Sequence, residues 1–142
     1  GNGILLEDAV PISDELGKMM VGTHQYFDFS VTASTKNANL LYKILIHKDQ
    51  NSTLNDENVR LYLTQLMGSY EEEKVLIPFS ELETETIHNK DYYVLYEKKL
   101  GKDLNNYSDS YRLRMWIKED AKDYEEQYFS IKIDVYAYQV EG

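Results

Sequence analysis

The chain has no cysteine, and it has few prolines and glycines. Without cysteine it can form neither disulfide bonds nor zinc sites built on sulfur, and thiolate catalysis is excluded. With 2 prolines and 7 glycines in 142 residues, a collagen-like or low-complexity chain is excluded as well. No stretch reaches the ~18 consecutive apolar residues of a membrane-spanning helix. These absences indicate a folded domain that is held together by side-chain packing.

Basic residues are outnumbered by acidic ones, 15 Lys+Arg against 25 Asp+Glu, which gives a net charge of −10. Because nucleic-acid phosphates would meet like charge, we expect no nucleic-acid partner. The 42% hydrophobic content is enough for a core, and the length suits a single domain over residues 1–142. The chain begins with Gly1 and not with Met. We therefore expect a piece that lacks an upstream signal or anchor segment and makes no membrane contact itself.

Alternation of apolar and polar residues is the main pattern, and it is typical of strands with one buried face. It is clearest over residues 111–118 and 129–137, where Leu113, Met115, Ile131 and Ile133 fall on the inward side. Shorter runs of the same kind occur at residues 27–31, 40–46, 75–77 and 92–96. Residues 59–67 fit both alternation and a helical stripe; we favour a strand because the neighbouring segments predict strands.

Polar turn clusters separate these runs, and no long helix is indicated. The clusters are Ser34–Asn37, Asp49–Ser52, Gly101–Asn106 and Glu119–Glu126. Strands at such intervals predict an all-β fold. We expect a single antiparallel β-sandwich, Ig-like or jelly-roll, with about 7–9 strands and little helix.

No motif predicts catalysis. The histidines His24, His47 and His88 are scattered, and no nucleophile elbow or phosphate-binding loop is present. We therefore expect neither enzymatic activity nor a cofactor.

An acidic loop offers a weak calcium candidate in Glu119, Asp120 and Asp123. It lacks the ligand order of an EF-hand, and Lys118 and Lys122 oppose a dedicated site. A solvated loop without metal is the favoured interpretation.

The outward sides of the last two strands carry aromatic and basic residues. These are Arg112, Arg114, Trp116, Lys132 and Tyr136. If the strands pair as a hairpin, the register with Arg114 opposite Asp134 forms an ion pair and two cation–aromatic contacts. A slip of two residues would instead place Arg114 opposite Lys132, so we predict the first register. This exposed face could stack a sugar or dock another protomer; alternatively, the long basic side chains cover Trp116 and nothing binds.

The order of features also carries a resemblance. It rests on the opening Leu6–Gly17, the runs Tyr26–Ser34, Leu41–Ile46 and Val59–Thr64, the segment Tyr111–Asp120, and the closing Phe129–Ala137. The most specific part is Leu113–Asp120, which reads Leu-Arg-Met-Trp-Ile-Lys-Glu-Asp. The chain resembles uncharacterised exported proteins of Gram-positive bacteria. Its layout is similar to that of the camelysin and biofilm-matrix fibre family, whose members share a jelly-roll or Ig-like sandwich. The resemblance implies an extracellular or cell-envelope location; it carries over no active site, since the His-Glu-x-x-His of a metalloprotease is absent.

These observations favour a non-enzymatic extracellular module of a bacterial cell-surface or matrix protein. It would act by protein–protein contact or self-assembly, because a face or a strand edge can bind without special side chains. The alternatives are a carbohydrate-binding module, with a glycan as partner, and a phage or virion structural domain.

Overall fold

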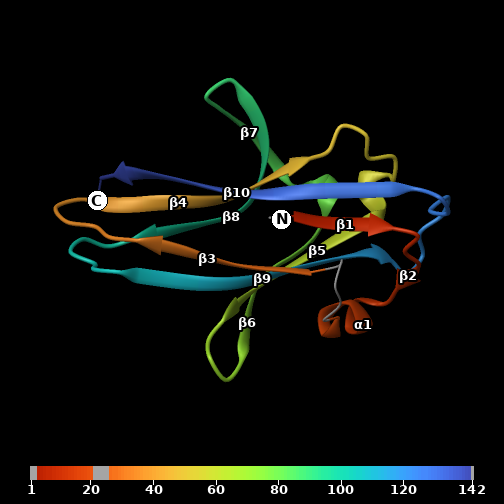
Figure 1. Cartoon of the computed structure of the whole chain (residues 1–142), viewed down its shortest axis with the longest axis horizontal. Coiled ribbons are helices and arrows are strands. Elements are labelled where there is room, and N and C mark those ends of the chain that lie inside the picture. Colours follow the sequence, from red (N-terminus) through yellow and green to blue (C-terminus); the bar gives the residue numbers. More distant parts are fainter. Residues whose placement is uncertain (1–2, 21–25, 142) are drawn as a thin grey trace.

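The computed structural model describes residues 3–20 and 26–141, and strands dominate it (Figure 1). Strand residues make up 61% and helical residues 9%, which confirms the all-β prediction. The elements in chain order are β1 (Gly3–Glu7), β2 (Pro11–Ile12), α1 (Asp14–Met19), β3 (Tyr26–Ala33), β4 (Asn39–Lys48), η1 (Asp56–Asn58), β5 (Val59–Leu66), β6 (Glu71–Pro78), η2 (Phe79–Glu81), β7 (Glu83–Ile87), β8 (Lys90–Leu100), β9 (Tyr107–Lys118) and β10 (Tyr128–Val140).

The strands form two five-stranded sheets. Sheet A has the order β1-β10-β4-β8-β7, and sheet B has the order β2-β9-β5-β6 with β3 also paired to β9. The described ranges thus hold ten strands, more than the 7–9 predicted. The strands missed are β1, β2 and β7, of five, two and five residues, because alternation over so few residues gives little signal.

The strand pairing is nested. The hairpin of β5 and β6 is enclosed by the pair β4 and β8, then by β3 and β9, and finally by β1 and β10. The chain therefore follows the path of one long antiparallel ribbon folded around the core. Pairing of β10 with β4 and of β5 with β9 joins the turns of this ribbon into the two sheets.

Both sheets contribute to one hydrophobic core. Leu113 and Met115 of β9 and Ile131 and Ile133 of β10 are all buried in it, as their alternation predicted. The ambiguous segment is strand β5, and its three alternate apolar residues, Val59, Leu61 and Leu63, are fully buried. The prediction of a strand there is confirmed.

The predicted hairpin of the last two strands is wrong. Strand β9 lies in sheet B and β10 in sheet A, so Arg114 is opposite Tyr26 and Tyr62 while Asp134 is opposite Leu45. The nine residues 119–127 between the strands carry the chain from one sheet to the other, whereas a tight hairpin has a two-residue loop. The inward side chains of β9 and β10 therefore meet across the core instead of side by side.

Candidate functional site

The five residues predicted to form one exposed face lie on two different sheets. Arg112, Arg114 and Trp116 are on β9 of sheet B, and Lys132 and Tyr136 are on β10 of sheet A. The structure therefore does not bring them together, because the two strands belong to opposite layers.

Trp116 is not exposed: its relative exposure is 1%. Helix α1 covers it, and the indole Nε1 donates a hydrogen bond to Asp14 Oδ1 at 3.1 Å. The helix begins where the Ser13 hydroxyl accepts a hydrogen bond from the Leu16 amide, an N-cap that satisfies one free backbone donor. The side chain of Trp116 is thus part of the packing between sheet B and α1, and it is not available on the surface.

Gly17 is what allows α1 to lie so close to the indole. A Cβ at this position would lie 2.2 Å from Cδ2 of Trp116, closer than any side chain could tolerate. Because glycine has no side chain, α1 can pack directly against the indole ring of Trp116.

The basic residues of β9 are engaged within sheet B. Arg114 is buried and donates to both carboxylate oxygens of Glu71, at 2.8 and 3.1 Å. These hydrogen bonds, helped by one from Thr64, lower the pKa of Glu71 to about 2. Arg112 pairs with Asp28 at 2.7 Å. Both guanidinium groups are thus already paired with carboxylates of the same sheet.

Tyr136 and Lys132 lie on the outer surface of sheet A. The ring of Tyr136 lies 5.7 Å from that of Tyr138 and meets the His88 ring edge-on at 5.6 Å. His88 and Asn89 form the two-residue turn between β7 and β8, and both have positive φ, 51° and 64°, as a type I′ turn requires. The hairpin of β7 and β8 thereby reaches over β10, and a cavity of about 240 Å³ lies between them.

Among the described residues, the second half of β10 has a strand on one side only. Within the described residues, β1 pairs with the first part of β10, from Glu7 opposite Tyr128 to Gly3 opposite Lys132 (Figure 1). Among residues 3–20 and 26–141, no strand pairs with the β1 side of Asp134–Val140. We call these seven residues the open edge.

The open edge combines free backbone groups with exposed apolar side chains. Val135 is 42% and Tyr138 37% exposed, and Ala137 between them is exposed too. The only charged residue in the segment is Asp134. An exposed strand edge with so little charge is a template for pairing with another chain.

Two other strand edges carry features that hinder pairing. Strand β6 opens with Glu71, Glu72, Glu73 and Lys74 and ends in Pro78, while the short β7 carries Glu83 and Glu85. Charges, proline and shortness all discourage edge-to-edge association. Compared with these two edges, the open edge has no proline and a single charge.

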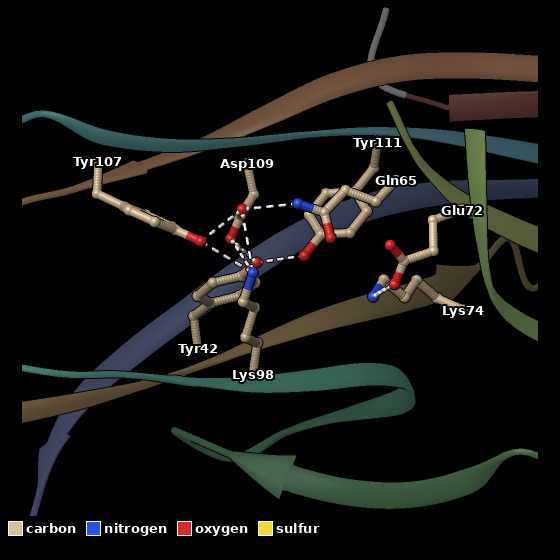
Figure 2. A network of polar contacts seen from close by, with 8 residues as sticks. All are labelled: Tyr42, Gln65, Glu72, Lys74, Lys98, Tyr107, Asp109 and Tyr111. Atoms are coloured by element: carbon tan, nitrogen blue, oxygen red, sulfur yellow. Dashed lines mark hydrogen bonds and ion pairs between the residues drawn. The ribbon is translucent and has the colours of Figure 1, made fainter. Parts of the chain in front are cut away.

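A buried polar network ties the two sheets together elsewhere in the core (Figure 2). At its centre the carboxylate of Asp109 on β9, 2% exposed, accepts hydrogen bonds from Tyr42, Gln65, Lys98 and Tyr107, at 2.6, 2.8, 3.1 and 2.7 Å. The donors come from β4, β5, β8 and β9. This cluster was not predicted, although an acid at an inward position of an alternating strand is a signal for it.

The network shifts the pKa of its members in the directions expected for a closed cluster. Burial alone would raise the pKa of Asp109, but the hydrogen bonds from Tyr42, Tyr107 and Lys98 lower it. Burial raises the pKa of Tyr111, which is hydrogen-bonded to Tyr42, to about 12. Within the described part of the chain no buried side-chain donor or acceptor lacks a partner. The cluster is thus a cross-sheet tie whose polar groups are already occupied.

The acidic loop does not gather a metal site. No group of three or more His, Cys, Asp or Glu side chains that could hold a metal ion is found among the described residues. The calcium candidates Glu119, Asp120 and Asp123 are therefore not gathered into such a group. Asp120 instead forms an ion pair with Lys118, whose Nζ lies 3.9 Å from Asp120 Oδ1. His24 falls outside the described residues.

No helix in the described ranges is long and apolar enough to cross a membrane. Comparison of the chain with known protein-family models, with curated proteins and with solved structures finds no match.

Proposed function

We propose that the two sheets form a β-sandwich of the jelly-roll type. Without the short β2 and β7, the sheets have the orders β1-β10-β4-β8 and β3-β9-β5-β6. A jelly roll has eight strands in two sheets, and the nested pairing follows from wrapping one antiparallel ribbon around a core. In an Ig-like sandwich more of the consecutive strands share a sheet, so the strand order favours the jelly roll.

We further propose that the protein is a non-enzymatic module that acts by protein–protein contact or assembly at a bacterial cell surface or in an extracellular matrix. The open edge is the observation that carries this proposal. Along seven residues, one side of β10 has no strand partner among the described residues, and Val135, Ala137 and Tyr138 beside it are exposed. Backbone pairing at an edge provides affinity without catalytic or metal-binding groups, and the buried polar network supports the same conclusion because its groups are occupied within the fold.

The test compares the assembly of three proteins by sedimentation velocity and electron microscopy. Val135→Lys places a charge on the open edge, a device that natural edge strands use against pairing. Ser108→Lys adds the same charge at an exposed position of β9, outside the open edge, and serves as the matched control.

The unaltered chain is expected to associate as its concentration rises. We expect Val135→Lys to weaken this association at least tenfold and Ser108→Lys to leave it within twofold. A chain that remains monomeric at every concentration, or equal association of the three proteins, would overturn the proposal.

A further inference from the structure

We infer that the open edge pairs with the open edge of a second copy of this chain, antiparallel and about a two-fold axis at Ala137. This inference rests on the proposed function, because it assigns a partner to the same edge. It would extend sheet A continuously across two molecules. Identical surfaces that meet in this way form a closed, isologous dimer.

The sequence of the open edge is complementary to itself in this register. With Ala137 opposite Ala137, Tyr136 faces Tyr138, Val135 faces Gln139, and Asp134 faces Val140. Aromatic pairs across antiparallel strands are favourable, and like charges directly opposite are unfavourable. Here two tyrosine pairs form, and no charge faces a charge.

The register also uses the whole of the open edge. Shifting the axis to Tyr136 would extend the pairing to Lys132, which is already opposite Gly3 of β1. Shifting it to Tyr138 would bring Val135 opposite Glu141. Only the axis at Ala137 pairs all seven residues while the described part of β1 stays in place.

Exposed side chains on both sides of the strand suit the same arrangement. Val135 and Ala137 continue the inward alternation of Phe129, Ile131 and Ile133, yet both are exposed. A second strand beside them would cover these apolar groups, as β1 covers the first half of β10. On the other side, Tyr136 and Tyr138 would join the tyrosines of the partner.

The net charge of −10 predicts how this pairing depends on salt. Two copies repel each other over long range, while the paired segments carry one charge each. Added salt screens the repulsion, so association should tighten several-fold between low salt and about 0.15 M ionic strength. An interface built on opposite charges would show the reverse.

The absence of cysteine allows a direct test by cross-linking. In Ala137→Cys, the two thiols lie directly opposite each other, where Cα atoms of antiparallel strands are about 4.5–5.5 Å apart. This distance permits a disulfide. In the control Gln139→Cys, the two thiols are offset by four residues, about 13 Å along the strand, and cannot be joined.

We expect Ala137→Cys to form a disulfide-linked dimer under mild oxidation, at least ten times faster than Gln139→Cys. Circular dichroism establishes that both variants fold, and sedimentation of the unaltered chain reports association itself. If the chain associates but Ala137→Cys does not cross-link, the two-fold pairing is refuted while assembly by another contact stands. Equal cross-linking of both variants likewise refutes the register. If the chain does not associate at all, the inference and the proposed function both fail.

Discussion

The contact of Gly17 with Trp116 gives the sharpest test of how the N-terminal segment packs. In Gly17→Ala, the new Cβ would lie 2.2, 2.3 and 2.6 Å from three atoms of a buried indole. Alanine otherwise favours a helix over glycine by ~0.5–1 kcal/mol. The substitution would therefore stabilise an isolated helix but destabilise this helix, which is packed against Trp116.

The expected loss follows from what α1 must give up if it moves away from the ring. Exposing one face of the indole, roughly 100 Å², costs about 2.5 kcal/mol. Losing the hydrogen bond from Trp116 to Asp14 costs about 1 kcal/mol more. After the gain in helix propensity, we expect Gly17→Ala to lower the free energy of unfolding by about 2–3 kcal/mol, or Tm by about 6–12 °C.

The assay uses the single tryptophan of the chain as its own probe. We expect blue-shifted, weakly quenched fluorescence from the unaltered protein, and a red shift with stronger iodide quenching from Gly17→Ala. Leu16→Ala changes a residue of the same helix that is 54% exposed, and should stay within about 0.5 kcal/mol. Unchanged emission and unchanged Tm in Gly17→Ala would show that α1 does not cover Trp116.

Two further predictions concern buried and half-buried acids. Asp109→Asn keeps the shape of the side chain but removes a charge that accepts four donors, and should lower the free energy of unfolding by about 2 kcal/mol in urea at pH 7. Because the pKa of Asp109 is lowered in the fold, its contribution is present above the ordinary pKa of an aspartate and fades on acidification. The variant should therefore lose less stability than the parent as the pH falls, and parallel plots of stability against pH would contradict this. Glu71, whose pKa falls from 4.5 to about 2, stabilises the fold above pH 4.5 and loses that contribution between pH 4.5 and 2. The full pKa shift corresponds to ~3 kcal/mol of stability. Because 35% of the side chain is exposed, solvent screening reduces this to roughly 1–2 kcal/mol. Unfolding of Glu71→Gln between pH 2 and 6 should therefore show a shallower acid decline, and an unchanged decline would assign it to other groups.

Most strands could be predicted from the sequence because a strand imposes a period of two on its own residues. The buried face of β9 and of the first half of β10 followed from this rule alone, as did the choice of strand for β5. The rule also placed Val135 and Ala137 inward, and both are exposed. Strands β1, β2 and β7 were missed because they are too short to show the period.

The candidate site was less predictable because exposure depends on neighbours far away in the chain. The outward register of Trp116 and Arg114 suggested a binding face, yet α1 covers one residue and Glu71 of β6 engages the other. The sequence carried one signal for the open edge, because residues 135–140 hold no charge. That β1 runs beside only part of β10 was visible only in the structure.

The sequence by itself determined the all-β character of the protein, the inward residues of its long strands and the exclusion of sulfur chemistry, because composition and side-chain alternation are local properties. Only the tertiary structure decided that β9 and β10 lie in different sheets and that a glycine-bearing helix covers the tryptophan. It also decided that, among the described residues, the second half of β10 has a strand on one side only. Strand partners are chosen by the closure of the whole ribbon around its core, and no short stretch of sequence contains that choice.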